Sequence, residues 1–336
     1  MTQPVTVASV IINQSSGANQ SGGSEACNRL RREIEDAFTA QNVRVQWLPL
    51  SRRELSRSRE RAVEQLVVRA EGTIVAAGGD GTVNAVATAC RKFHRPFGIL
   101  PAGTFNYVAR NLGLPLDIAE AAKVIAAGYS APIHVGEING KLFLNNAGFG
   151  LYSQMVERRE MAKRRYGRHQ VVAFLSGMKC LFERHPVYDL HITTDGKEHS
   201  LRTTTLFFGV NALQLQNYNV ELAKYVEAGK LAVLSLRLDS RVDIARMAAA
   251  ALFDKVEAAD CVDATAATSI RVTTRRRELK VAIDGEIVVL KAPLSARVVH
   301  DGLTVMLPEP QPEQQAAEPR DEDQAALPPA PELSAN

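Results

Sequence analysis

The sequence predicts two folded domains: an α/β domain with a mostly parallel sheet, followed by a mainly antiparallel β domain. The chain has 336 residues and is 46% apolar, which is enough to form two ordinary cores. In its first third, short β-branched runs alternate with amphipathic segments, as in open sheets covered by helices on both faces. Beyond residue 128 the strand-like pieces follow one another with turn residues between them. The predicted domains are therefore 1–128 and 129–307.

Seven segments make up the predicted α/β domain. The predicted strands are 5–12, 43–48, 73–77 and 96–100, and the predicted helices are 25–40, 61–70 and 82–93. Because strands and helices alternate, the strands should lie parallel in one sheet with helices on both faces.

Three strand-rich segments, 134–150, 187–210 and 279–290, indicate the second domain. Within them, Asn139-Gly140 and Asp195-Gly196 are predicted hairpin turns, because these residue pairs tolerate positive φ. Residues 308–336 are rich in Pro, Ala and acidic side chains, with few large apolar ones. Such a segment cannot bury enough surface to offset its ordering entropy, so it is predicted to be a disordered tail.

Composition excludes several classes of protein. The 40 Lys and Arg against 37 Asp and Glu give a net charge of +3, without the excess expected of a nucleic-acid-binding protein. The four cysteines are scattered and form no CxxC pair, so neither a zinc site nor a disulfide framework is indicated. No run reaches the roughly 18 apolar residues that span a bilayer, and no basic segment precedes the first apolar stretch. A cytoplasmic protein is expected, with peripheral contact at a membrane surface left open.

An aspartate stands among glycines where the third predicted strand ends, in Gly78-Gly79-Asp80-Gly81-Thr82. Glycines at this place allow backbone N–H groups to approach an anion, and the following helix adds partial positive charge. Asp80 would repel a bare phosphate. The carboxylate of Asp80 is compatible with a bound phosphate if a divalent cation lies between them, or if Asp80 polarises the hydroxyl that attacks the phosphate. The alternative is a plain glycine turn with Asp80 as the helix N-cap.

Two further polar loops follow neighbouring predicted strands. Gly103 and Thr104 follow the fourth strand and open a helix, and Asn13, Ser16 and Gly17 follow the first. Loops of this kind at adjacent strand ends indicate a nucleotide site. Neither the Walker A loop nor the Rossmann fingerprint is present at these positions.

Five segments together resemble one known family, the catalytic domain shared by diacylglycerol kinases, sphingosine and ceramide kinases and bacterial lipid kinases. They are 78–86 (GGDGTVNAV), 100–115 (LPAGTFNYVARNLGLP), 143–155 (FLNNAGFGLYSQM), 162–168 (AKRRYGR) and 281–288 (VAIDGEIV). The GGDGT segment alone also resembles NAD kinases and phosphofructokinases. The resemblance covers roughly residues 5–307. It implies a NAD kinase/diacylglycerol kinase-like α/β fold for the first domain and a lipid-binding β-rich second domain, with phosphorylation of a lipid hydroxyl that depends on ATP and Mg²⁺.

The resemblance also implies roles for individual residues. Asp80 would lie near Mg²⁺, Glu286 would accept the proton of the lipid hydroxyl, and Asp284 would stand beside it as a further catalytic residue. The implied ATP-binding residues are Asn13, Gly78, Gly79, Asp80, Gly81, Thr82, Asn84, Gly103 and Thr104. Taken without the resemblance, Asp284-Gly285 is an ordinary hairpin turn and Glu286 a solvated strand residue.

The chain departs from the family pattern at three positions. Ala228 stands where an Asp of a structural magnesium site is expected, Ala85 where a Glu is frequent, and Gln14 where a Pro is usual. None of these changes affects the residues to which a catalytic role is assigned.

The function predicted is an ATP-dependent lipid kinase acting on a lipid such as diacylglycerol or a sphingoid base. A NAD kinase-like enzyme and a non-catalytic nucleotide- and lipid-binding module are the alternatives. The expected partners are the lipid and an anionic membrane surface, with no nucleic acid, and a homodimer is left open. Segment 158–169 (RREMAKRRYGRH) and the run 275–277 are basic enough to contact anionic headgroups. The alternative, a solvated helix face, is slightly favoured for such residues.

Overall fold

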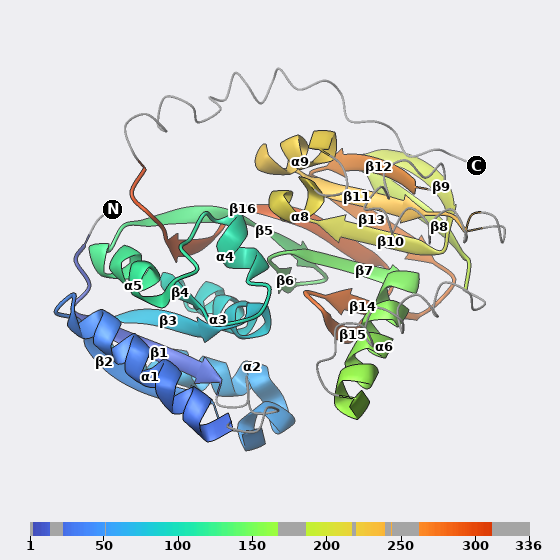
Figure 1. The fold of residues 1–336 in the computed structure, drawn as a ribbon. Helices are drawn as coiled ribbons and strands as arrows, with labels where there is room; N and C mark the ends of the chain where they lie inside the picture. Colours follow the sequence, from blue (N-terminus) through green and yellow to red (C-terminus); the bar gives the residue numbers. More distant parts are fainter. Residues whose placement is uncertain are drawn as a thin grey trace. The chain divides into compact units, whose positions relative to one another are not determined.

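The computed structural model describes residues 3–13, 23–50, 52–166, 186–216, 220–238, 243 and 262–310. The predicted tail beyond residue 310, Ser16, Gly17 and the end of the basic segment 162–168 lie outside this range. The described residues form two compact units (Figure 1). Unit 1 comprises those within Met1–Val135 and His300–Glu318, and unit 2 those within Gly136–Val299 and Pro319–Asn336.

Unit 1 is built on a parallel sheet with helices packed against it (Figure 1). Its strands are β1 (Val7–Asn13), β2 (Arg44–Leu50), β3 (Thr73–Gly78), β4 (Phe97–Pro101), the first part of β5 (Ser130–Ile138) and the end of β16 (Leu294–Met306). Its helices are α1 (Gly23–Thr39), α2 (Arg52–Arg69), α3 (Asp80–Lys92), α4 (Tyr107–Asn111) and α5 (Ile118–Ala127).

The strand order in unit 1 brings the candidate loops to one edge. The order is β2-β1-β3-β4, and each of these pairs is parallel. β1, β3 and β4 are therefore neighbours whose carboxyl ends lie at the same edge. Chain order reverses beside β1, and ligands of open α/β sheets bind at such switch points.

Alternation along the strands gives the sheet two apolar faces. Val10 and Val75 are fully buried and face Phe38 of α1 and Ile125 of α5 in one core cluster. The intervening positions, such as Ile74, are also fully buried, and α2 and α3 pack against each other over strands of the same sheet. Burial on both faces is what a parallel sheet requires.

Helix α5 is an element that the sequence analysis did not anticipate. Asp117 caps its first turn by accepting a hydrogen bond from the Glu120 amide, 3.0 Å away. Gly128 ends it in the left-handed conformation at φ 76°. Both are standard helix-end signals, so the sequence did contain the information needed to predict this helix.

Unit 2 contains a six-stranded antiparallel sheet of order β12-β11-β10-β7-β14-β15 and a second antiparallel run, β16-β13-β8-β9. The strands not yet given are β6 (Lys141–Phe143), β7 (Asn146–Gly150), β8 (Tyr188–Thr194), β9 (Lys197–Thr203), β10 (Thr205–Gly209), β11 (Leu231–Leu236), β12 (Val262–Ala267), β13 (Ser269–Thr274), β14 (Glu278–Ile283) and β15 (Glu286–Lys291). The helices are α6 (Leu151–Tyr166), α8 (Ala212–Gln216) and α9 (Val220–Glu227).

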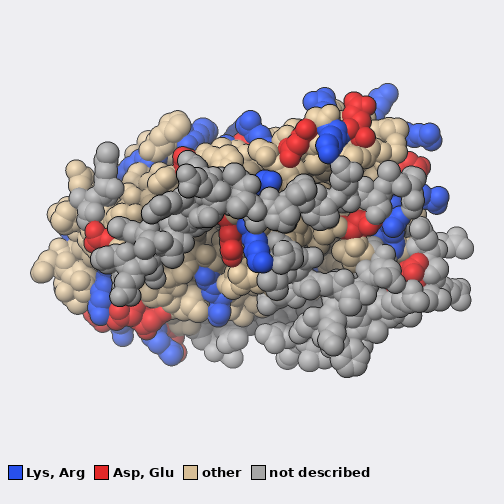
Figure 2. All heavy atoms as spheres, turned by 90° about the horizontal axis from the view of Figure 1, so that it is seen from above, with Lys and Arg blue, Asp and Glu red and all other residues tan. Residues whose placement is uncertain are grey.

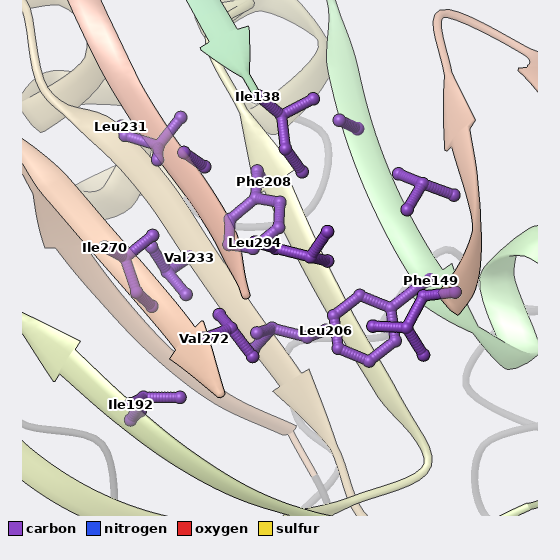
Figure 3. Packing of buried hydrophobic residues seen from close by; sticks show 14 of the residues in the cluster. Ile138, Phe149, Ile192, Leu206, Phe208, Leu231, Val233, Ile270, Val272 and Leu294 are labelled. Carbon is purple, nitrogen blue, oxygen red and sulfur yellow. The ribbon is translucent and has the colours of Figure 1, made fainter. Parts of the chain in front are cut away.

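The core of unit 2 lies between its two sets of strands (Figure 3). Phe149 and Phe208 come from the six-stranded sheet, and Ile270 and Leu294 from the second set. Figure 3 shows these side chains among other labelled members of the cluster. On the opposite face of the six-stranded sheet, α8 and α9 pack over β11 and β12 through a second cluster that includes Leu222.

These observations confirm the predicted fold class. Both predicted hairpin turns occur, with φ 47° and 78° at Asn139 and Gly140 and 45° and 86° at Asp195 and Gly196. The predicted domain limits, 128/129 and 307/308, differ from the division into units. The difference arises because the end of β16 pairs in parallel with β4, at Val305 and Phe97, so the last strand returns to unit 1.

Charged side chains of both signs are interspersed on the face presented in Figure 2. This distribution agrees with the small net charge of +3. None of the helices in the described part of the chain combines the length and apolarity needed to cross a membrane.

Candidate active site

The N-terminus of α3 has no side-chain cap. β3 ends at Gly78, and Gly79 is the N-cap residue, with extended backbone and no side chain capping the helix. The amides of Thr82 and Val83 donate to the Gly79 carbonyl, at 2.8 and 3.1 Å. The amides one and two residues after the N-cap precede the first intrahelical bonds, so they remain available to a ligand.

The glycines at two of the candidate loops are explained by contact between the loops. A Cβ added to Gly103 would lie 2.4 Å from the Gly79 Cα, and one added to Gly79 would lie 3.2 Å from the Gly103 Cα. The two backbones therefore touch where β3 and β4 end. This contact requires glycine at Gly103 whether or not a phosphate binds there.

Asn106 holds the second loop in shape, and the sequence analysis did not single it out. It is buried and adopts the left-handed conformation, at φ 51°. Its Oδ1 accepts the Gly103 amide at 2.9 Å, and its Nδ2 donates to the carbonyls of Pro101 and Gly103, at 3.3 and 3.1 Å. Asparagine tolerates this conformation better than most residues, and that preference was the available sequence signal.

Asp80 connects the two loops. It is the first residue of α3, and its Oδ1 accepts the Val108 amide of α4 at 3.0 Å. The simple alternative of Asp80 as the N-cap of its own helix is therefore wrong. Its Oδ2 has no hydrogen-bond partner within the described ranges. Asp80 is half-buried at the first turn of a helix, where the dipole favours negative charge.

The other predicted nucleotide residues lie at or near the same edge of unit 1. Asn13 is the last residue of β1, Gly81 and Asn84 belong to the first turns of α3, and Thr104 is exposed in the loop after β4. Their roles in binding remain predictions. Burial raises the pKa of the nearby Cys90 thiol on α3 to about 12, which excludes it as a nucleophile at neutral pH.

In unit 2, Asp284 and Gly285 form the turn between β14 and β15. Their φ values of 45° and 83° are those of a type I′ turn. The Asp284 carboxylate accepts three backbone amides: Leu144 at Oδ2, 2.8 Å, and Asn145 and Asn146 at Oδ1, both 2.9 Å. Asp284 therefore fastens the turn to the segment that leads into β7. This supports a positioning role for Asp284, whereas its predicted catalytic role stays a prediction.

Glu286 is exposed and is the first residue of β15. It stands opposite Ile283 in the hairpin, and two residues along, Val288 stands opposite Val281. Because side chains alternate along a strand, Glu286 belongs to the same face as these core residues. It therefore places a carboxylate at the end of the apolar face of the hairpin.

Buried amide side chains surround the start of β7. Asn146 donates to Gln214 at 2.8 Å, and Asn211 donates to Asn145 at 2.7 Å. The Tyr152 hydroxyl donates to Asn146. These hydrogen bonds engage both side-chain polar atoms of Asn146 and the Oδ1 of Asn145, and they support the segment that holds the Asp284 turn.

The apolar residues around this pair belong to the core. Phe143 and Phe149 are fully buried in the unit 2 cluster, and Phe149 makes an edge contact with Tyr188, with ring centroids 5.3 Å apart. The segment 143–155 thus contributes core packing as well as the polar support for the turn.

Unit 1 is an α/β domain in which α3 begins without a side-chain cap, and comparison with known proteins shows what this part of the chain resembles. A sequence model described as "Diacylglycerol kinase catalytic domain" matches residues 8–138. Residues 8–138 are therefore similar to the diacylglycerol kinase catalytic domain family.

Two curated relatives carry related names. The "Diacylglycerol kinase" of Bacillus subtilis (strain 168) is 36% identical over 140 residues, covering 40% of this chain and 45% of the relative. The "Probable lipid kinase YegS-like" of Klebsiella pneumoniae (strain 342) is 40% identical over 148 residues, covering 43% and 46%. The matched regions therefore span less than half the length of these relatives.

Solved structures show the same fold over a larger share of the chain. A protein from Bacillus anthracis str. Sterne aligns with a TM-score of 0.68 at 21% identity, covering 93% of this chain and 97% of that one. A structure of a diacylglycerol kinase from the same strain aligns with a TM-score of 0.60 at 17% identity, covering 93% and 99%. At these identities the likeness concerns the fold.

Proposed function

We propose that this protein is a lipid kinase that transfers the γ-phosphate of ATP to the hydroxyl of a lipid such as diacylglycerol or a sphingoid base. The observation that carries the proposal is the uncapped N-terminus of α3 with Asp80 in its first turn, within a segment of the diacylglycerol kinase catalytic domain family. The names of the two relatives support a lipid acceptor over NAD.

The phosphate donor is assigned to unit 1. The open amides of α3 are suited to the ATP phosphates because they combine N–H donors with the positive end of the helix dipole. Thr104, exposed in the loop after β4, adds a hydroxyl donor. The contact of Gly79 with Gly103 fixes the two loops in one arrangement, so little reorganisation is needed when ATP binds.

The residues at this edge fit a magnesium ion held jointly with phosphate. Asp80 Oδ1 is engaged by the Val108 amide, and the second carboxylate oxygen is left to coordinate. The described residues contain no group of three or more His, Cys, Asp and Glu side chains that could hold a metal. Mg²⁺ in kinases is typically bound by one or two carboxylates plus substrate phosphates and water, which needs no such group. When bound, the ion supplies neutralisation of phosphate charge.

The acceptor is assigned to unit 2. Glu286 is proposed to accept the proton of the lipid hydroxyl, because one carboxylate suffices for this step when phosphoryl transfer depends mainly on positioning. Asp284 is proposed to hold the turn, since its carboxylate is bonded to three amides. The apolar face that Glu286 shares with Val288 suits a hydroxyl attached to an apolar tail.

The test is transfer of labelled γ-phosphate from MgATP to lipids in mixed micelles, with NAD and fructose 6-phosphate as soluble acceptors. Label in a chloroform-extractable product is expected and identifies the acceptor. Label only in NAD would move the assignment to a NAD kinase-like enzyme. Binding of ATP without transfer to any acceptor would instead indicate a non-catalytic module.

Two variants with matched controls test the residues. Asp80→Asn keeps the acceptor for the Val108 amide but removes the charge, so activity should fall by about 10²-fold or more with the fold unchanged. Asp117→Asn, which alters another aspartate that accepts a helix amide, should keep its activity. Glu286→Gln should lower kcat by about 10²-fold with little change in ATP affinity, and Glu278→Gln, at the far end of the same hairpin, should not.

A further inference from the structure

Two histidines face each other on paired strands of unit 1. His134 belongs to β5 and His300 to β16, and both fall within the limits of unit 1. The two strands are paired, and further along the same pair the Asn139 amide donates to the Ser295 carbonyl at 3.0 Å. Residue numbers rise along one strand as they fall along the other, so the pair is antiparallel and His134 stands opposite His300. Their rings meet edge to face, with centroids 4.6 Å apart.

The ring nitrogens of this pair are lightly engaged. The Asp301 amide donates to the Nδ1 of His134 at 3.4 Å, which is longer than an ordinary hydrogen bond. His300 makes its ring contact with His134 and has no hydrogen-bond partner among the residues that the structure describes. Both residues are exposed, so ions reach them from solvent. A ligand can therefore take a lone pair from each ring without breaking a strong hydrogen bond.

The charge state of the pair suits a cation. Partial burial, and then the neighbouring His300, hold the pKa of His134 below its usual value, against the opposite effect of Asp301. His134 is therefore neutral at neutral pH, and the neutral imidazole is the form that binds a metal ion. The Asp301 carboxylate, close enough to act on this pKa, adds negative charge beside the rings.

We propose that His134 and His300 together bind a divalent late transition-metal ion such as Zn²⁺ or Ni²⁺, through one imidazole nitrogen each. Imidazole suits these ions, whereas Mg²⁺ prefers oxygen ligands. Zn–N bonds are about 2.0–2.1 Å long, so two nitrogens on one ion lie about 3 to 4 Å apart, which rings in direct contact reach by rotation about their side-chain bonds. The described ranges contain no group of three or more metal-ligating side chains, so water completes the coordination.

The ion would join two strands that lie far apart in the sequence. His134 and His300 are brought together only when β5 pairs with β16, so the unfolded chain does not present both ligands at once. An ion that binds the folded form alone stabilises it. The site is distinct from the magnesium assigned to Asp80, and this inference does not depend on the proposed function.

Binding is tested by NMR on the full chain. Imidazole signals of the ¹⁵N-labelled protein are followed during addition of NiCl₂, which broadens the signals of the residues that bind it, with MgCl₂ as control. Those of His134 and His300 are assigned by their absence from His134→Gln and His300→Gln. Both should broaden together, at lower Ni²⁺ concentration than the signal of His191, and neither should respond to Mg²⁺. Broadening of only one of the pair, or equal broadening of all three histidines, would overturn the proposal.

Stability of unit 1 supplies the second test. ZnCl₂ should raise the urea midpoint reported by the fluorescence of Trp47, which belongs to β2 of this unit, and EDTA should reverse the change. His134→Gln and His300→Gln alter exposed residues, so both should fold, and each should lose the whole response to Zn²⁺. His191→Gln is the matched control, because His191 is also exposed on a strand but contacts Ser200, at 3.3 Å, and should respond like the wild type. A response that is absent from the wild type, or that persists in either variant of the pair, would refute the two-histidine site.

Discussion

Substitution of Asp284 should separate the stability of its turn from the chemistry beside it. In Asp284→Ala the amides of Leu144, Asn145 and Asn146 lose their acceptor. All three residues are less than 7% exposed, so water cannot replace the carboxylate. At about 1 kcal/mol for each buried amide left unsatisfied, the loss is about 3 kcal/mol. Alanine in the left-handed conformation adds about 1 kcal/mol.

Two further substitutions resolve the contributions at Asp284. Asp284→Gly removes the acceptors without backbone strain and should cost about 3 kcal/mol. Asp284→Asn keeps Oδ1, which serves two of the amides, and tolerates the positive φ of 45°. It should cost only about 1 to 2 kcal/mol, because only the Leu144 amide loses its acceptor. The expected order of destabilisation is therefore Ala, then Gly, then Asn.

The assay is urea unfolding followed by far-UV circular dichroism and by fluorescence of the single tryptophan, Trp47. Trp47 belongs to β2 of unit 1, so fluorescence should report no change while the dichroism transition of unit 2 shifts. Asp195→Asn is the matched control, because its carboxylate accepts the amides of Thr268 and Ser269 in the same type of turn. Those residues are exposed, so the control should cost about 0.5 kcal/mol or less.

The catalytic readout completes the Asp284 experiment. Folded Asp284→Asn should keep kcat within a few-fold of the wild type, because the turn before Glu286 persists. An Asn variant less stable than the Ala variant would refute the hydrogen-bond argument. A stable Asn variant that is more damaged in kcat than Glu286→Gln would show that Asp284 is the base.

Three other predictions follow from the structure and the composition. Gly103→Ala should weaken ATP binding and lower the free energy of unfolding by about 1 to 3 kcal/mol. Gly79→Ala should have a smaller effect, because a Cβ added at Gly103 lies 2.4 Å from the neighbouring backbone and one added at Gly79 lies 3.2 Å away. Equal losses of stability in the two variants, measured by calorimetry, would contradict the contact between the loops. Cys90, with its pKa near 12, should resist iodoacetamide at pH 8 while the half-exposed Cys27 reacts, as peptide mass spectrometry can check. Truncation at Pro308 should leave the thermal midpoint and specific activity unchanged, whereas a large loss of either would show that the tail docks on the fold.

The local sequence was sufficient to predict which segments form strands or helices and where the hairpin turns lie. The alternation of β-branched runs with amphipathic segments predicted the parallel sheet of unit 1, because periodicity is set by each backbone separately. The turns at Asn139, Asp195 and Asp284 follow from the tolerance of Asn-Gly and Asp-Gly for positive φ. Helix α5 could equally be predicted from its caps at Asp117 and Gly128.

The candidate site was only partly predictable. The sequence marked Asp80 as unusual, since a carboxylate among phosphate-type glycines demands an explanation. It could not show that Asp80 accepts the Val108 amide, because that bond joins loops after different strands. The contact of His134 with His300 was likewise beyond reach, because residues so far apart in the sequence become neighbours only when β5 pairs with β16.

What the sequence by itself determined is the set of local conformations: strands, helices, glycine loops and hairpin turns, each fixed by φ preference and by the spacing of apolar residues. The tertiary structure decided which of these touch. It showed that Gly103 is required by the backbone of Gly79 and that the Asp284 carboxylate serves amides about 140 residues earlier in the chain. It also placed the end of β16 beside β4. Contacts of this range depend on strand order and packing, which local preferences leave open.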